Sequence, residues 1–325
     1  MNEQVIFAQV EPTTKCNFTC GFCCGRSMDQ SNLSLEQFQK FLDLFPEIKY
    51  MELQGEGEPL IHPQFFEMVD LASQRDIHIS FITNGSLLTI QNVQRILESN
   101  IASIRISLET TNPAKFKQIR GSSFENVQRG ITRLLTERSR LGLTRPSVGV
   151  ALTVLASTLQ DLPNIFQFYI DSGMDGGIAI QSLNRMPQYS QFYSQEFQGE
   201  YLERKQHGAE YQRYMSSEVV QKIWQEKSAI AHFYDQLFKP TLDEQAQGKL
   251  TNCPWLRSGI NLDRHGRLTP CCMVKGERWS FGKLTELSKE ELLQKRAALA
   301  QELTQGQIPE PCQGCKIAQG IIQYD

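Results

Sequence analysis

Short apolar runs alternate with longer amphipathic segments along the first 182 residues of this 325-residue chain. Runs of this length with few polar residues are typical of buried parallel strands. They lie at Val5–Val10, Tyr50–Leu53, Ile77–Thr83, Ser103–Leu108, Val148–Leu155 and Gly177–Gln181. Strands that alternate with helices predict an α/β fold of parallel βαβ units. Six such units do not complete a closed eight-fold barrel.

The segments between these runs place their apolar residues on one helical face. The first predicted helix follows Ser34, which forms a capping-box signature with Gln37. Further helices are predicted at Pro63–Arg75, Val93–Glu98, Phe124–Leu141 and Leu162–Ser172. Because parallel barrels carry their chemistry at the carboxyl ends of the strands, we expect functional residues in the loops that follow each strand.

The pattern changes after residue 182. From Asn184 to Tyr214, tyrosines and phenylalanines are interspersed with glutamines. Such a segment could cover a substrate, because rings with polar tips suit a partly wet pocket, or it could pack its rings on the barrel surface. Ser217–Leu250 predicts a helix. We therefore expect a barrel domain at 1–182, a helical and aromatic connecting region at 183–250, and a cysteine-rich domain at 251–325.

Composition narrows the functional classes. The net charge of -3 and the isoelectric point near 6.0 predict neither nucleic-acid binding nor attraction to an anionic membrane. No apolar run approaches the roughly 20 residues that span a bilayer. The N-terminal residues contain neither a basic region nor a signal cleavage site. Nine cysteines in such a chain favour metal binding over disulfides, so we expect a cytoplasmic protein.

Three of the cysteines, Cys16, Cys20 and Cys23, lie within eight residues in the loop after the first predicted strand. A segment this short cannot bury three thiols in a core. We therefore expect all three to bind one common group. Thiolates hold iron–sulfur clusters and zinc, each with four ligands, so three leave one position open. An open position marks a reactive centre. A zinc knuckle or a chance cluster is the alternative.

The spacing Cys-x3-Cys-x2-Cys resembles that of the radical S-adenosylmethionine (SAM) enzymes. The resemblance implies a partial (β/α)6 barrel in which Cys16, Cys20 and Cys23 hold three irons of a [4Fe-4S] cluster. It also implies that SAM chelates the fourth iron and is cleaved reductively. The resulting 5′-deoxyadenosyl radical abstracts hydrogen from an unactivated C–H bond.

A second motif, Gln54-Gly55-Glu56-Gly57-Glu58-Pro59, follows the second strand. Its glycines let the backbone approach a ligand, and a carboxylate beside them can pair with an ammonium group. It resembles the family's Gly-Gly-Glu-Pro motif, with Glu56 in place of the first glycine. The resemblance implies that Gly57 and Glu58 contact the amino group of SAM. Without its context, the motif would be an acidic β-turn.

The resemblance implies further cofactor contacts at the ends of later strands. Asn84 ends the third strand, and Ser107 and Glu109 end the fourth, where family members place a residue that contacts ribose. Arg120 resembles the basic residue that meets the cofactor carboxylate. Val150 and Ile180 are expected near adenine. Each of these residues could instead be an ordinary loop or core residue.

The last predicted domain contains Cys253, Cys271, Cys272, Cys312 and Cys315. The set resembles the twitch domain, a shorter relative of the SPASM extension of radical SAM enzymes. There, a C-x17-C pair and a later C-x2-C pair ligate one auxiliary [4Fe-4S] cluster, which implies that Cys253, Cys271, Cys312 and Cys315 do so here. A zinc ribbon is the alternative. Cys24 and Cys272 are then spare, and Cys24 is expected to be a small buried filler.

Three fates of the substrate radical compete. In epimerisation, a thiol returns hydrogen to the opposite face, and Cys272 is the candidate catalytic donor. In dehydrogenation, a base takes a proton and the auxiliary cluster accepts an electron. In peptide maturation, the radical forms a crosslink. Because the first motif begins at Cys16, we expect no N-terminal leader-binding module, which disfavours crosslinking. A hypothesis of a different class is a non-catalytic iron–sulfur scaffold. The predicted SAM contacts of Glu58, Ser107 and Arg120 argue against it, because a scaffold needs no SAM pocket.

The expected partners follow from this chemistry. The substrate is a peptide or a small molecule such as a sugar or aminocyclitol. Reductive cleavage of SAM also needs an electron donor such as flavodoxin or ferredoxin. No nucleic acid or membrane partner is expected.

Overall fold

The computed structural model describes residues 4–225, 253–315, 317 and 318. Nine strands in this part of the chain form one β-sheet, in the order β6-β5-β4-β3-β2-β1-β7-β8-β9. Its first six strands pair in parallel and confirm the six predicted strands. They are β1 (Phe7–Val10), β2 (Tyr50–Leu53), β3 (His78–Thr83), β4 (Ile101–Ser107), β5 (Ser147–Val154) and β6 (Ile178–Ser182).

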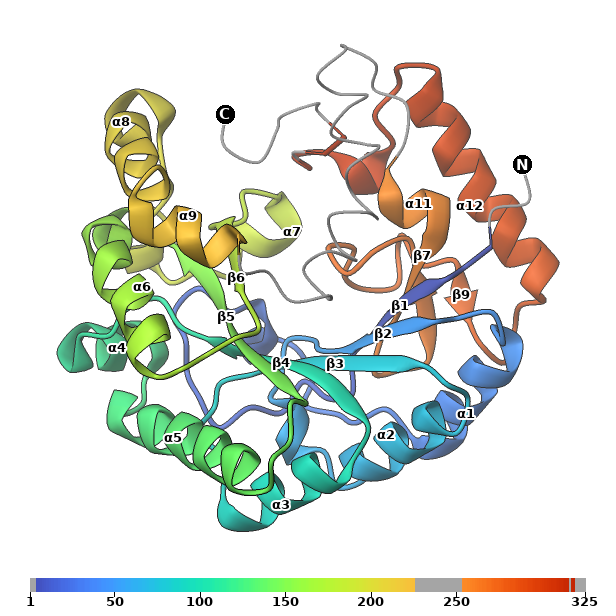
Figure 1. Cartoon of the computed structure of the whole chain (residues 1–325). Helices are drawn as coiled ribbons and strands as arrows, with labels where there is room; N and C mark the ends of the chain where they lie inside the picture. Colours follow the sequence, from blue (N-terminus) through green and yellow to red (C-terminus); the bar gives the residue numbers. More distant parts are fainter. Residues whose placement is uncertain (1–3, 226–252, 316, 319–325) are drawn as a thin grey trace.

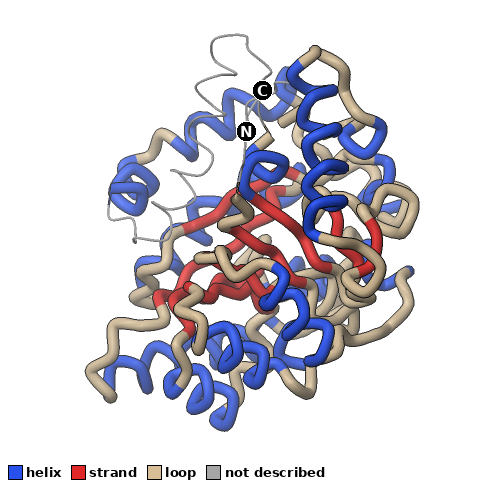
Figure 2. The backbone as a smooth tube through the Cα atoms, turned by 90° about the vertical axis from the view of Figure 1, so that its right-hand side faces the viewer, coloured by secondary structure: helices blue, strands red, loops and turns tan. Residues whose placement is uncertain are grey.

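The sheet curves into an open arc, and helices cover its outer side (Figure 1). Seen from the side, the strands lie inside a shell of helices (Figure 2). The helices that join successive strands are α1 (Leu35–Leu44), α2 (Phe65–Ser73), α3 (Ile90–Glu98), α4 (Pro113–Arg120), α5 (Phe124–Arg140) and α6 (Leu162–Asp171). The capping box of α1 is formed by Ser34 and Gln37, as predicted. An α/β partial barrel is thereby confirmed.

The sheet continues into the cysteine-rich region, which the sequence did not predict. β7 (Gly259–Leu262) pairs in parallel with β1, so it extends the barrel beyond its first strand. β8 (Arg267–Thr269) and β9 (Gly282–Lys283) then add in antiparallel fashion. The cysteine-rich region is therefore joined to the barrel through backbone hydrogen bonds next to the cysteine loop.

Several helices also escaped sequence analysis. The connecting region contains α7 (Pro187–Ser190) and α8 (Arg204–Met215), and the last domain contains α11 (Pro254–Ser258) and α12 (Lys289–Thr304). α9 (Glu218–Gln225) confirms the start of the helix predicted from Ser217, and the rest of that prediction lies outside the described residues. Short 3-10 helices lie at Cys24–Ser27, Pro59–Ile61, Ala156–Asp161, Gln195–Phe197 and Glu310–Cys312.

The main core lies between the sheet and its outer helices. Its largest buried side chains include Phe38, Phe41, Phe65, Phe81 and Phe116. None of the helices in the described part of the chain is both long and apolar enough to cross a membrane.

Candidate active site

The Cys-x3-Cys-x2-Cys motif lies in the loop after β1, at the carboxyl edge of the sheet. The end of α4 holds this loop, because the N–H groups of Thr19 and Gly21 donate to the carbonyls of Arg120 and Ile119, each at 3.1 Å. Gly121 permits the contact: its φ is 68°, and a Cβ atom there would lie 1.9 Å from Thr19 Oγ1. A helix missed from the sequence therefore positions the cysteines.

The three thiols differ in exposure: Cys16 is exposed, Cys23 half-buried and Cys20 buried. Burial raises the pKa of Cys16 and of Cys20, and it raises the pKa of Cys23 to about 12 with contributions from Glu56 and the other two thiols. A bound iron–sulfur cluster would supply the positive charge that keeps such thiols deprotonated.

The arrangement of the thiols fits a cluster. Among the residues that the structure describes, no three His, Cys, Asp or Glu side chains converge closely enough for a single metal ion. A [4Fe-4S] cluster takes each cysteine on a separate iron. Three thiols from one loop, one of them exposed at the barrel mouth, suit a cluster with one accessible iron.

The second motif packs directly on the cysteine loop. The N–H group of Glu58 donates to the carbonyl of Lys15 at 2.9 Å. A Cβ atom on Gly57 would lie 2.4 Å from the carbonyl oxygen of Thr13. The sequence suggested that this glycine makes room for a ligand. In the structure it makes room for the cysteine loop itself, and its contact with SAM stays a prediction.

Glu58 is 1% exposed, and its carboxylate organises the neighbouring strand end. It accepts hydrogen bonds from Thr83 Oγ1 at 2.8 Å, from the N–H of Asn84 at 2.7 Å and from the N–H of Leu60 at 3.2 Å. Burial raises the pKa of Glu58 to about 7, although these bonds oppose the shift. Asn84 also lies beside Cys16, with Nδ2 3.9 Å from its sulfur. Two predicted cofactor residues thus meet at the first cysteine.

Glu109 and Arg120 form a buried ion pair with two contacts of 2.5 Å. Although burial alone would lower the pKa of Arg120, the carboxylate of Glu109 raises it. Nη1 of Arg120 also lies 3.7 Å from the sulfur of Cys20. The two predicted cofactor residues are therefore adjacent to the cysteine loop but already paired with each other. Their contacts with SAM stay predictions.

The residues predicted to contact the adenosyl group lie on three neighbouring strands. Ser107 ends β4 and is half-buried, whereas Val150 in β5 and Ile180 in β6 belong to the hydrophobic core. The register pairs Ser107 with Ala151 and Ile180 with Leu152. Ser107 therefore lies on the opposite face of the sheet from Val150 and Ile180. Their roles also stay predictions.

The aromatic segment covers the cysteine loop. Phe197 packs on Phe22 with ring centroids 5.8 Å apart, and the N–H of Ser194 donates to the carbonyl of Gly21 at 3.0 Å. Tyr193 joins the same small apolar cluster. The sequence left open whether this segment covers a substrate or packs its rings on the barrel. For these residues, the structure shows rings packed on the barrel, at its mouth.

The four cysteines assigned to the auxiliary site come from three parts of the last domain. Cys253 precedes α11, Cys271 follows β8, and Cys312 and Cys315 lie near the end of the described chain. Burial raises the pKa of Cys253 to about 11 and that of Cys312 to about 12, and the thiol of Cys315 adds to both shifts. Cys253, Cys312 and Cys315 pack on one apolar cluster. The folded chain gathers these thiols, as a cluster requires.

The adjacent Cys271 and Cys272 have different surroundings. Burial raises the pKa of Cys271 well above its usual value, and Cys272, Cys253 and Cys315 add to the shift. Burial also raises the pKa of Cys272 to about 12, but its charged neighbours are Lys275, Glu52 and Glu56. Cys271 therefore lies near the other cysteines of the last domain, whereas Cys272 lies near charged residues of the barrel.

Three residues that sequence analysis did not assign join the two sites. Lys275 Nζ lies 2.8 Å from Glu56 Oε1, and the hydroxyl of Tyr189 lies 3.1 Å from the same oxygen and 3.0 Å from the carbonyl of Cys272. The departure from glycine at Glu56 was the signal in the sequence. Its partner could not be deduced, because Lys275 lies in a distant segment.

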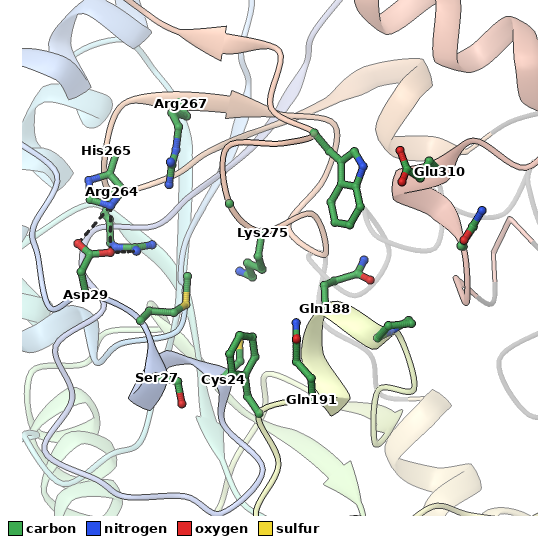
Figure 3. A pocket seen from close by; sticks show the side chains of 16 residues that line it. Cys24, Ser27, Asp29, Gln188, Gln191, Arg264, His265, Arg267, Lys275 and Glu310 are labelled. Atoms are coloured by element: carbon green, nitrogen blue, oxygen red, sulfur yellow. Dashed lines mark hydrogen bonds and ion pairs between the residues drawn. The ribbon is translucent and has the colours of Figure 1, made fainter.

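A cavity of about 590 Å³ opens at the seam between the barrel loops and the last domain. In Figure 3, Lys275 lies between Arg264 and His265 on one side and Gln188 and Gln191 on the other. Cys24 also borders the cavity but is almost fully buried, as expected for a filler.

Comparisons with known proteins agree with this site. Residues 10–168 match the radical SAM superfamily, and residues 253–316 match SPASM, an iron–sulfur cluster-binding domain. The chain is 27% identical over 188 residues to the tungsten-containing aldehyde ferredoxin oxidoreductase cofactor-modifying protein of Pyrococcus furiosus, covering 56% of this chain and 53% of the relative. It is 29% identical over 148 residues to the mycofactocin maturase MftC of Mycolicibacterium smegmatis, covering 44% and 36%. The chain thus spans about half or less of these curated relatives.

Solved structures share the fold. SuiB of Streptococcus suis bound to S-adenosylmethionine superposes with a TM-score of 0.70 at 12% identity, covering 99% of this chain and 72% of SuiB. SuiB bound to its precursor peptide SuiA gives 0.66 at 12% identity, covering 99% and 71%. The residues at the two cysteine sites fit a [4Fe-4S] cluster with SAM in the barrel and an auxiliary cluster in the last domain. The chain belongs to the radical SAM superfamily, as an enzyme with a C-terminal SPASM-type iron–sulfur domain.

Proposed function

We propose that this enzyme epimerises a residue of a peptide and that Cys272 is the hydrogen donor. The observation that carries the proposal is the opposed placement of two adjacent cysteines. Cys271 lies with Cys253 and Cys315, whereas Cys272 lies beside Glu52 and Glu56 at the barrel mouth. The hydrogen-atom donor must lie on the side of the last domain that faces the barrel, because the SAM-derived radical forms in the barrel. A cysteine fixed by a neighbouring cluster ligand meets this need.

The two faces of the substrate carbon then have different roles. The radical supplied by SAM removes a hydrogen atom from one face. The thiol of Cys272 gives its hydrogen atom to the other face, which inverts the carbon and leaves a thiyl radical. One electron and one proton restore the thiol, and reduced flavodoxin or ferredoxin is the proposed source of the electron.

The seam cavity supports a peptide as the substrate class. The side-chain amides of Gln188, Gln191 and Gln313 border it, together with Phe192 and Trp279. An amide can both donate to and accept from a peptide backbone, and aromatic faces accommodate side chains of varied shape. The mycofactocin maturase relative and the peptide-bound SuiB structure agree with this choice.

The proposal is tested by producing the enzyme with short peptides encoded beside its gene and repeating the reaction in deuterated water. Epimerisation places one deuterium at the inverted carbon. Cys272→Ala should still consume SAM but yield no inverted residue. Cys24→Ala removes the other spare cysteine, and this variant should still yield the inverted residue with its solvent deuterium.

The competing reactions give different products. Dehydrogenation or crosslinking removes two hydrogens from the peptide and leaves no solvent deuterium at an inverted carbon. If Cys272→Ala turns over normally, the donor role is wrong, and dehydrogenation with the auxiliary cluster as electron acceptor becomes the better account.

A further inference from the structure

A buried ion pair joins the SAM motif to the auxiliary-cluster domain. Glu56 belongs to the loop after β2, and Lys275 belongs to the loop between β8 and β9. Lys275 Nζ lies 2.8 Å from Glu56 Oε1, and the two side chains are 14% and 15% exposed. Charges this far from water interact more strongly than a surface pair, and removing one leaves the other uncompensated.

The acidic member of this pair adjoins a predicted ligand of the first cluster. The sulfur of Cys23 lies 3.7 Å from the backbone oxygen of Glu56 and 4.0 Å from Oε2 of its carboxylate. An unpaired carboxylate here would repel an added electron on the cluster. Lys275 offsets that charge. Glu11, which also contacts the Glu56 loop, has its own ionic partner in Arg264 at 3.0 Å.

Tyr189, which lies in the connecting region, contacts both members of the ion pair. Its hydroxyl lies 3.1 Å from Glu56 Oε1 and 3.0 Å from the carbonyl of Cys272, and Lys275 Nζ lies 5.6 Å from the centre of its ring. The ring face attracts a cation. The ammonium group of Lys275 is therefore fixed in position by contacts with two different segments.

We propose that Lys275 is a positioning residue through which the auxiliary-cluster domain sets the reduction potential of the SAM-binding cluster. It does so by neutralising Glu56 beside Cys23. The potential is then highest when the two domains are docked, so the cluster accepts its electron readily only in the assembled site. This inference rests on the family assignment and is independent of the substrate chemistry proposed above.

The test measures the midpoint potential of the SAM-binding cluster by redox titration with electron paramagnetic resonance, without substrate. SAM identifies the signal, because it perturbs only the cluster that it chelates. Lys275→Met should shift the midpoint to a more negative value, and Glu56→Gln should shift it to a more positive one. The double variant should return close to the wild-type value, and Lys275→Arg should retain it.

Lys289→Met is the matched control. Lys289 in α12 pairs with Glu47 at 2.8 Å, so it also joins the last domain to the barrel. Glu47 precedes β2, however, whereas Glu56 follows it, so the two pairs lie at opposite ends of that strand. Lys289→Met should leave the midpoint unchanged.

A structural role alone would not produce shifts of opposite sign. If Lys275→Met and Glu56→Gln shift the midpoint in the same direction, or if neither shifts it while both clusters are present, the proposal is wrong. If Lys275→Met alone fails to fold, the comparison of Glu56→Gln with the double variant decides. Adding Lys275→Met to Glu56→Gln must then lower the midpoint, and an unchanged value overturns the proposal.

Discussion

The two cysteine sites of this enzyme are built in different ways. Cys16, Cys20 and Cys23 come from one short loop, held by the end of α4 and by the second motif, and Cys16 is exposed. The auxiliary set comes from three separate segments of the last domain, and all of its cysteines are half-buried. A short loop leaves one side of a cluster accessible, whereas a set gathered from several segments encloses it. The difference predicts a reactive first site and a closed second one.

The contrast extends to how each site depends on the fold. The first loop is held by backbone hydrogen bonds to the end of α4 and to the second motif. The second set unites Cys253, Cys312 and Cys315 around the small apolar cluster of Leu256, Leu303 and Ala318. A metal centre that draws separate segments together contributes directly to folding. We therefore expect catalysis to depend mainly on the first site and stability mainly on the second.

The largest effect should come from removing the first site. Two clusters give about eight irons per chain. Replacing Cys16, Cys20 and Cys23 together by alanine should leave about four irons and abolish SAM cleavage. Iron analysis and detection of 5′-deoxyadenosine measure the two outcomes. SAM cleavage by the triple variant would show that the barrel loop is not the reactive site.

Removal of the second site should have the opposite pattern. Cys312→Ala should lose the auxiliary cluster and lower the unfolding temperature, because the metal no longer joins the segments of the last domain. The first cluster should remain and should still cleave SAM without substrate. Calorimetry and iron analysis check both points. Stoichiometric zinc in the wild-type site would contradict the auxiliary-cluster assignment.

A third effect sharpens the role of Glu58 at the first site. A charge-assisted hydrogen bond contributes roughly 1.5–3 kcal/mol, so Glu58→Ala should weaken SAM binding about ten- to a hundredfold. Thr83→Val is the control, since it removes one bond to this carboxylate but keeps its charge. Titration calorimetry on the reconstituted protein measures both. Unchanged affinity in Glu58→Ala would mean that this carboxylate does not meet the cofactor.

The smallest effect is a pH dependence of the same contact. The pKa of Glu58 is raised to about 7, so its carboxylate is lost as the pH falls below that value. SAM affinity should rise about threefold between about pH 6.5 and about 7.5. The folded state also holds this proton more tightly than the unfolded chain, so the cofactor-free fold should lose stability as the pH rises through about 7. Glu58→Gln should flatten both profiles, and a wild-type-like slope in that variant would assign them to another group.

Local signals predicted most of the barrel. Buried strands and the Ser34 capping box depend on neighbouring residues, so the sequence contains them directly. α8 was missed because Arg204–Met215 is mostly polar and shows no clear apolar face. β7 was missed because its pairing with β1 joins opposite ends of the chain.

In the candidate site, as in the fold, the features that depend on neighbouring residues were predicted and the contacts between distant segments were not. Cysteine spacing predicted both sets of ligands, because the chemistry of a cluster requires those residues, and their role as ligands stays a prediction. The bidentate pair of Glu109 and Arg120 and the contact of Glu56 with Lys275 were not deduced. Each depends on how separate loops meet in space, and spacing along the chain does not report that.

The central claim is that one chain contains a SAM-accessible cluster and a closed one. The most direct test is electron paramagnetic resonance of the reduced, reconstituted protein before and after addition of SAM. The account predicts two [4Fe-4S] signals, of which only one changes with SAM, and that signal should vanish when Cys16, Cys20 and Cys23 are replaced. A SAM-induced change that survives this replacement would contradict it.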